Sequence, residues 1–351
     1  MNISLLPDTT RHLILVLGPE LLAFITALLL TPPFIRALNK YGIKKQIRDN
    51  AITGEKANLF KQLHAKKTGT PTMGGVLIWG TTLFVIAVSR LLSAIGVFDK
   101  SLLNRKETWL PIATLVATAM LGLIDDYINV KSESKGIKVK PKFFWLLAFA
   151  TLGALWFYFK LGYNQLYIPL IGDIAIGWLY IPLFIFIIIA TANAVNITDG
   201  LDGLAGGLLI IAFTAFGIIA YIKGLLILAA LCGVISGTLF AFVWFNIPPA
   251  KFYMGDTGAL SLGATLGVIA MLTDSVFVLP IIGAVFVIET LSVIIQIASK
   301  KIFHKKVFHI APFHHHLEYI GWSESTIVMR CWIMGGFIAV LGLILYIFGK
   351  I

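Results

Sequence analysis

Apolar runs long enough to cross a lipid bilayer recur along the whole chain, and they constrain its fold more than any other feature. Roughly 20 consecutive apolar residues make one transmembrane helix. Of the 351 residues, 58% are hydrophobic and only 13% are charged, whereas a soluble domain of this length would expose far more charge. The sequence therefore predicts an all-α polytopic membrane protein that forms a single integral membrane domain over residues 1–351. About ten segments are predicted to span the membrane: 13–34, 73–95, 108–124, 143–161, 177–194, 204–222, 225–245, 258–276, 278–298 and 328–349.

Basic residues predict the orientation of these spans, because loops rich in Lys and Arg resist translocation. Most of the 28 Lys and Arg residues follow odd-numbered spans, above all in residues 35–72. We therefore expect these loops to be cytoplasmic and both termini to be periplasmic. Two β-prone runs about Gly172-Asp173 predict a small periplasmic hairpin between the fourth and fifth spans. Because membrane topology explains most of the net charge of +11, that charge does not predict a nucleic-acid partner.

The positions of the acidic residues are the next constraint. Asp125 and Asp126 close the third predicted span, Asp199 and Asp202 follow the fifth, and Asp256 follows the seventh. All five therefore fall on the predicted cytoplasmic side. One isolated Asp at a helix end can be an ordinary cap, but acids near a hydrocarbon core are costly and usually functional. Their grouping predicts an active-site cleft at the cytoplasmic face.

These carboxylates suit a hard divalent cation such as Mg²⁺, which prefers oxygen ligands and keeps coordination positions for phosphate. Together with the basic loops they predict a site for a polyanion such as a nucleotide diphosphate. If their segment is helical, Asn196, Asp199 and Asp202 share one face of a starting helix, and Gly200 would let a ligand approach the backbone. The sequence has no Gly-rich Walker loop ending in Lys-Ser or Lys-Thr, which argues against ATP hydrolysis of that kind.

Three consecutive histidines, His314, His315 and His316, lie in the last predicted cytoplasmic loop. Successive helical residues point about 100° apart, so three in a row cannot all face one metal. Hydrogen bonding to phosphate or sugar is the better functional interpretation, whereas the residues alone slightly favour an interfacial triplet without a ligand. Glu289 and Gln296 lie seven residues apart inside the ninth span, which predicts that both face protein or a water-filled groove.

Five motifs occur in order along the chain, at Lys67–Gly75, Leu123–Tyr127, Asn193–Leu204, Phe252–Gly258 and Ala311–Glu318. With them the chain resembles the phospho-N-acetylmuramoyl-pentapeptide transferases (translocase I of peptidoglycan synthesis), within the polyprenyl-phosphate N-acetylhexosamine-1-phosphate transferase superfamily. The resemblance implies transfer of phospho-N-acetylmuramoyl-pentapeptide from UDP-N-acetylmuramoyl-pentapeptide to undecaprenyl phosphate. Lipid I and UMP would be the products. It also implies Mg²⁺ as cofactor, the bacterial inner membrane as location and, in many members, a homodimer.

The resemblance also implies roles for individual residues. Asp125, Asp126 and Asp256 match the family's essential acids, with Asp256 as the expected metal ligand. Lys142 is a weaker match, because the loop before it varies in length within the family and Lys140 could be the true counterpart. The positions that match the substrate cleft are Lys67, Thr72, Asn196, Asp199, Gly200, Asp202, Asn246, Gln296, His314, His315 and His316.

Several alternatives stay open at this point. We expect the lipid phosphate to attack the sugar-linked phosphorus directly, but a covalent aspartyl-phosphate route is not separated from it by sequence. The related N-acetylglucosamine-1-phosphate transferases share the Asp motifs, whereas residues 71–75 and the histidine run favour the muramoyl substrate. A transporter would predict broken helices repeated in two halves of the chain, and no such repeat is evident.

Overall fold

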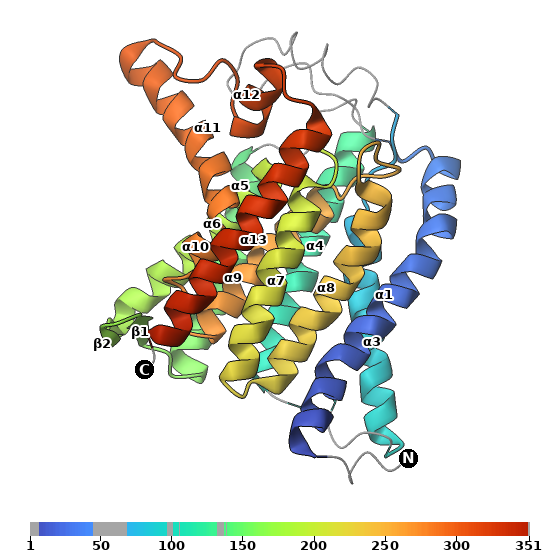
Figure 1. Cartoon of the computed structure of the whole chain (residues 1–351), viewed down its shortest axis with the longest axis vertical. Coiled ribbons are helices and arrows are strands. Elements are labelled where there is room, and N and C mark those ends of the chain that lie inside the picture. Colours follow the sequence, from blue (N-terminus) through green and yellow to red (C-terminus); the bar gives the residue numbers. More distant parts are fainter. Residues whose placement is uncertain are drawn as a thin grey trace.

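Helices that are long and apolar enough to cross a membrane make up most of the protein, as Figure 1 shows for the computed structural model of the chain. The structure describes residues 7–44, 69–96, 101–104, 106–131, 137 and 139–349. Within these residues, 8 helices meet the criteria of length, hydropathy and a low number of charged residues. The prediction of an all-α polytopic membrane protein is therefore confirmed.

The helices follow the predicted segments in order. α9 has 17 residues, and α11 carries Lys300 and Lys301 as well as the buried Glu289; neither helix is among the 8, so the count of about ten spans stays a prediction. The helices are α1 (Asp8–Lys40), α3 (Gly75–Ala94), α4 (Lys106–Lys131), α5 (Val139–Leu155) with the π-helical turn η3 (Trp156–Lys160), the 3-10 turn η4 (Gly177–Leu179), α6 (Tyr180–Thr198), α7 (Leu204–Ile222), α8 (Leu226–Asn246), α9 (Asp256–Leu272), α10 (Leu279–Ile282), α11 (Ala284–Phe303), α12 (Phe313–Tyr319) and α13 (Glu324–Phe348).

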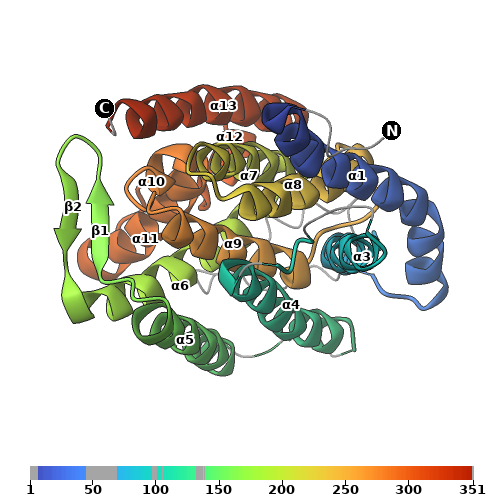
Figure 2. The ribbon, with the colours of Figure 1, turned by 90° about the horizontal axis from the view of Figure 1, so that it is seen from below.

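α9 lies at the centre of the bundle, between α4 and α6, and it also contacts α3 and α7 (Figure 2). Every residue of α9 from Thr257 to Leu272 is buried. Glycines allow this close packing: a Cβ added at Gly263 would lie 2.5 Å from the carbonyl oxygen of Thr191 in α6, and one at Gly258 would lie 2.9 Å from the Cα of Gly75 in α3. Such small residues let helix backbones approach closely in a membrane, where apolar surface alone drives little helix association.

α1 and α13 lie at the periphery. Only 11% of the most apolar window of α1 and 22% of that of α13 are buried, compared with 89% for α8. Outward side chains such as Leu29 and Phe337 are apolar and exposed. A surface of this extent is typical of contact with lipid.

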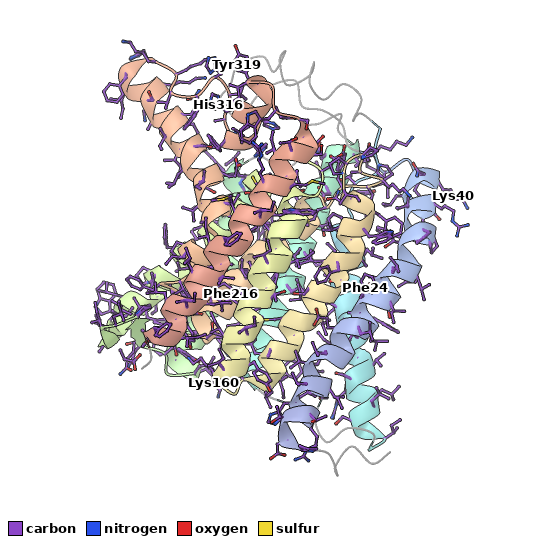
Figure 3. All side chains as sticks on the ribbon, in the orientation of Figure 1. Phe24, Lys40, Lys160, Phe216, His316 and Tyr319 are labelled. Atoms are coloured by element: carbon purple, nitrogen blue, oxygen red, sulfur yellow. The ribbon has the colours of Figure 1, made fainter. Side chains whose placement is uncertain are left out.

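Polar side chains mark the two ends of the bundle. Lys40, His316 and Tyr319 lie at one end and Lys160 lies at the other, with Phe24 and Phe216 between them (Figure 3). We call the first of these the α12 end. Both ends of the described chain lie opposite it (Figure 1), as an even number of crossings requires. The side of the membrane that each end faces stays a prediction.

A two-stranded antiparallel hairpin follows η3, with β1 (Gln165–Ile168) paired to β2 (Gly172–Ala175). The predicted centre of its turn was wrong: Gly172 pairs with Ile168 and opens the second strand, so the turn comprises residues 169–171. Pro169 has no N–H to donate to the ladder, which explains why the first strand ends before it.

The predicted end of the third span, at residue 124, was also wrong, because the helix extends further along the chain. α4 continues through Lys131, so Asp125 and Asp126 lie inside a continuous helix and do not close it. Both carboxylates are buried, so each needs a partner within the protein.

The contact between α1 and α8 predicts the effect of a substitution at Gly237, because a Cβ there would overlap the carbonyl oxygen of Glu20. We expect Gly237→Val to lower the thermal unfolding midpoint of the detergent-purified protein, since overpacking costs roughly 1–3 kcal/mol. Gly80→Val in α3 is the matched control, because no atom lies within 4 Å of its added Cβ. Equal midpoints for the two variants would contradict this account of the packing.

Candidate active site

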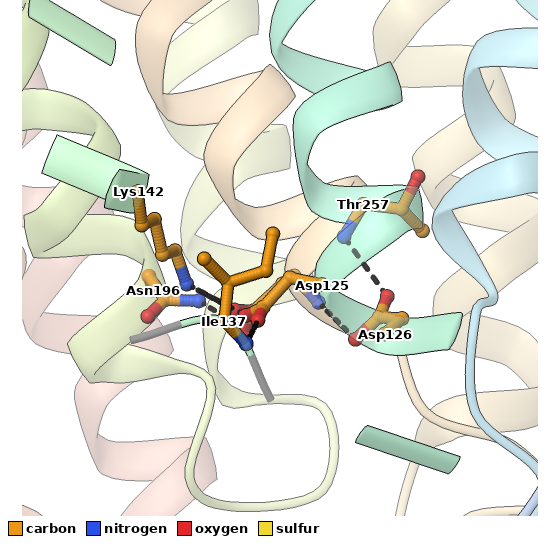
Figure 4. A network of polar contacts seen from close by, with 7 residues as sticks. Asp125, Asp126, Ile137, Lys142, Asn196 and Thr257 are labelled. Carbon is orange, nitrogen blue, oxygen red and sulfur yellow. Dashed lines mark hydrogen bonds and ion pairs between the residues drawn. The ribbon is translucent and has the colours of Figure 1, made fainter. Parts of the chain in front are cut away.

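Four helices bring charged and polar side chains together at the α12 end. Asp125 comes from α4, Lys142 from the first turn of α5, Asn196 from the last turn of α6 and Asp256 from the first position of α9. We call these four residues the Lys142 cluster (Figure 4). The sequence separates its members by up to 131 positions, so only the helix packing unites them.

Lys142 bridges two carboxylates. Its Nζ donates to Oδ2 of Asp125 at 3.1 Å and also contacts Oδ2 of Asp256. The second oxygen of Asp256 accepts from Nδ2 of Asn196 at 2.8 Å, and the second oxygen of Asp125 accepts from the backbone N–H of Ile137. Lys142 is therefore the lysine of this cluster, whereas Lys140 is exposed.

Asp126 has a different set of partners from its neighbour. Its two oxygens accept the backbone N–H groups of Asp256 and Thr257, each at 3.0 Å. The first N–H groups of a helix have no partner within that helix, so Asp126 caps α9 from α4. The carboxylate of Asp256 makes no such cap and turns to Lys142 and Asn196 instead.

Two glycines allow α4 to approach the start of α9. A Cβ at Gly122 would overlap the carbonyl oxygen of Asp256, and one at Gly255 would lie 2.5 Å from Oδ2 of Asp126. Gly255 also adopts φ +74°, in the left-handed region that favours glycine. The Gly-Asp-Thr-Gly sequence around Asp256 is thus required by backbone geometry as well as by charge.

Asp199, Gly200 and Asp202 lie in the turn between α6 and α7, whereas Asn196 is still within α6. The expectation that these positions share one face of a starting helix was therefore wrong. α6 ends at Thr198, and Gly203 takes φ +81° immediately before α7. The turn brings Gly200 against the ring of His314, which a Cβ at Gly200 would overlap.

Asp202 and Asn246 connect this turn to the segment that precedes Asp256. Asp202 accepts the N–H of Ala250 at 2.9 Å, and Asn246 accepts the N–H of Gly203 at 2.9 Å while it donates to the carbonyl of Phe252 at 2.8 Å. Both side chains are buried. Their role in substrate binding stays a prediction, and their contacts here hold two loops together.

The three histidines of α12 have three different environments. His314 is fully buried and its Nδ1 lies 2.9 Å from Oε2 of Glu289, whereas Nδ1 of His315 lies 2.7 Å from Oε2 of Glu318. The ring of His316 stacks on His309 at 5.4 Å between centroids. The sequence did not link Glu289 to the histidines. A carboxylate inside an apolar helix nevertheless indicates that it has a polar partner within the protein.

Three predicted cleft residues remain, namely Gln296, Thr72 and Lys67. Gln296 is buried, as expected, and its amide holds the backbone of Val307 and Phe308 with hydrogen bonds of 2.8 to 3.1 Å. Thr72 is buried in a segment that runs beside Tyr253, near the start of α9. Lys67 lies outside the described residues.

The Lys142 cluster is suited to binding a cation. One ammonium group contacts oxygens of Asp125 and Asp256 together, so these carboxylates converge closely enough to share one cation. Oxygen donors from two carboxylates and an amide are the ligand type of Mg²⁺. Among the described residues there is no group of three or more His, Cys, Asp or Glu side chains arranged around one metal position.

Comparison with known proteins gives a consistent set of relatives. Residues 108–274 match the family described as glycosyl transferase family 4. The chain is 36% identical to the phospho-N-acetylmuramoyl-pentapeptide-transferase of Desulfotalea psychrophila over 91% of this chain and 89% of the relative. It is 37% identical to that of Pelagibacter ubique, over 90% of this chain and 88% of the relative, and 38% identical to that of Shouchella clausii, over 92% and 94%.

The capping role of Asp126 predicts a loss of stability on its truncation. We expect Asp126→Ala to lower the thermal unfolding midpoint, because each buried N–H left without an acceptor costs about 1–3 kcal/mol. Ile124→Ala in the same helix is the control, since Ile124 is half exposed and its truncation leaves no polar group unpaired. If both variants unfold at the same temperature, Asp126 does not hold α9.

Proposed function

The chain belongs to the phospho-N-acetylmuramoyl-pentapeptide transferases, and from this premise we propose how its Lys142 cluster serves the reaction. The protein transfers phospho-N-acetylmuramoyl-pentapeptide in the first membrane step of peptidoglycan synthesis. We propose that the donor is UDP-N-acetylmuramoyl-pentapeptide and the acceptor undecaprenyl phosphate, with lipid I and UMP as products. The observation that carries this proposal is the convergence of Asp125 and Asp256 on one ammonium group at the α12 end.

Charge determines what the protein must contribute. Phosphoryl transfer requires mainly positioning of the reactants and cations that neutralise the phosphate oxygens. The acceptor is a phosphate monoester with a second pKa near 6, so it is mostly dianionic at neutral pH. A direct attack on the sugar-linked phosphorus therefore needs no strong general base, and the side chains of the cluster orient and neutralise the reactants.

Mg²⁺ is the proposed cofactor, with Asp256 as its main ligand and Asp125 and Asn196 beside it. When bound, the ion would neutralise diphosphate oxygens. Asp126 has a positioning role, because both of its oxygens accept N–H groups at the start of α9. The turn at residues 199–203, which is partly exposed at residues 199 and 200, and the His314 ring against it form the adjacent wall, where we propose that the nucleotide-sugar lies.

The proposed orientation places the α12 end in the cytoplasm of a bacterium, with the protein in its inner membrane. Arg36, Lys40 and Lys44 lie near the same end of α1, and basic residues are retained on the cytoplasmic side. Membrane lipids would then surround α1 and α13. A homodimer, which the resemblance implies, would bury part of this apolar surface.

The activity is tested by UMP release from the detergent-purified protein. With UDP-N-acetylmuramoyl-pentapeptide and undecaprenyl phosphate together we expect UMP and a lipid-linked product, and with either reactant alone we expect neither. UDP-N-acetylglucosamine is the discriminating donor and should give no product, consistent with the relatives found. Turnover of UDP-N-acetylglucosamine alone would favour the N-acetylglucosamine-1-phosphate transferase reading.

The proposed metal site predicts the effect of Asp256→Asn. Asn keeps the size of the side chain but removes the charge that holds a hard cation. Turnover should fall by more than the roughly 10–100-fold typical of residues one step removed from a metal, with part of it recovered at high Mg²⁺. EDTA should abolish wild-type turnover and added Mg²⁺ should restore it.

Asp173→Asn is the control for this prediction, because Asp173 lies in the hairpin at the opposite end. The unfolding midpoint of each variant is measured alongside UMP release. Normal turnover of Asp256→Asn at limiting Mg²⁺, or full wild-type activity in excess chelator, would contradict the metal assignment.

A further inference from the structure

The Lys142 cluster contains one position where a cation meets two carboxylates, and a lysine of the chain itself fills it. Nζ of Lys142 contacts Oδ2 of Asp125 and Oδ2 of Asp256. The other oxygen of each carboxylate already accepts a hydrogen bond, from Ile137 in one case and Asn196 in the other. The oxygens that face each other across the cluster are therefore those that Lys142 uses.

A divalent cation between the same carboxylates would compete with this ammonium group. Two cations a few ångströms apart repel each other strongly where little water screens them, and the side chains of Asp125 and Lys142 are only 3% and 20% exposed. Lys142 lies in the first turn of α5, and four methylene groups separate its charge from the backbone. Its ammonium can therefore move without movement of the helix.

We infer that Lys142 and the divalent cation are alternative occupants of the position between Asp125 and Asp256, so that binding of the cation releases Lys142 toward the diphosphate of the substrate. This inference rests on the proposed function, because it takes Mg²⁺ as the cofactor. Without the ion, Lys142 neutralises part of the negative charge of the two acids and holds α5 to α9. With the ion, the same two carboxylates bind the divalent cation, and the ammonium group of Lys142 is free to bind phosphate.

The exchange has an energetic consequence for the order of binding. The cation must displace an ion pair, so its affinity for the protein alone is reduced. A bound diphosphate offers Lys142 a new anionic partner and recovers that loss, so cation and diphosphate each increase the affinity for the other, as reciprocal coupling requires. Lys142 therefore links metal binding to occupation of the site by a substrate.

Binding of Mn²⁺ to the detergent-purified protein, followed by electron paramagnetic resonance without substrate, tests the exchange. Mn²⁺ is the probe because it takes the same oxygen ligands as Mg²⁺. Lys142→Met should bind Mn²⁺ about tenfold more tightly than the wild type, since the substitution removes the positive charge that competes with the ion for the two carboxylates. Its turnover should nonetheless fall, because the ammonium that meets the diphosphate is also lost.

Lys140→Met is the matched control, because it removes the same charge from the same helix but from an exposed position outside the cluster. Water and salt screen an exposed charge. Lys140→Met should therefore leave the Mn²⁺ affinity within about twofold of wild type. Lys142→Gln serves as a second variant that keeps a polar side chain and should also bind Mn²⁺ more tightly. A larger rise of the unfolding midpoint on Mn²⁺ addition in the Lys142 variants than in the wild type supports the exchange independently of turnover.

The outcomes separate this inference from the proposed function. If wild type and both Lys142 variants bind Mn²⁺ equally, with the binding lost in Asp256→Asn, the metal site stands and the exchange is wrong. If Lys142→Met binds Mn²⁺ more weakly, Lys142 supports the ion and the exchange is likewise wrong. If neither wild type nor variants bind Mn²⁺ at a site that needs Asp256, the proposed metal function fails together with the inference.

Discussion

The buried start of α9 is the constraint on which the rest of the site depends. A helix N-terminus presents backbone N–H groups that have no partner within the helix, and an unpaired buried N–H costs free energy. Asp126 supplies the missing acceptors from α4, while Gly122 and Gly255 give it room to do so. The same contact fixes α4 against α9 and thereby brings Asp125, the neighbour of Asp126, to face Asp256. The cap and the charge cluster are consequences of one packing arrangement.

Charge balance in the cluster explains why it is suited to anionic reactants that bring or share a cation. Asp125 and Asp256 together carry two negative charges against the single charge of Lys142. A buried carboxylate without a partner would be strongly destabilising, so each oxygen of these two side chains has one. In the proposed exchange, a divalent cation that replaces Lys142 would balance both negative charges, and phosphoryl transfer from a diphosphate requires such neutralisation by cations.

Two buried polar contacts from α11 support the surroundings of this cluster. Glu289 holds His314, so that the ring lies against Gly200 in the turn between α6 and α7. About two helical turns further along the same face, the side chain of Gln296 accepts the backbone N–H groups of Val307 and Phe308. Polar groups inside an apolar helix are expensive, and here each connects the helix to a loop near the site. The sequence separation of seven placed both on one helix face, as predicted, and burial confirmed that they face protein.

The amino-acid sequence by itself determined the membrane class, the order of the helices and the set of acids at one end of the bundle, because hydropathy over about 20 residues and motif order are local properties of the chain. It also indicated the family, since the five motifs are short contiguous segments. The ends of the helices and strands were harder to predict from the sequence: α4 runs past Asp125, α6 stops before Asp199 and the hairpin turn precedes Gly172.

Only the tertiary structure decided which partner each residue of the site contacts. Asp125 and Asp126 are adjacent and chemically identical, so no sequence pattern distinguishes them, yet one binds Lys142 and the other caps α9. The choice of Lys142 over Lys140 has the same origin, because only Lys142 reaches the carboxylates across the interface of α4, α5 and α9. The physical reason is that successive residues of a helix point in different directions, and which direction meets a partner is set by packing between segments far apart in the chain.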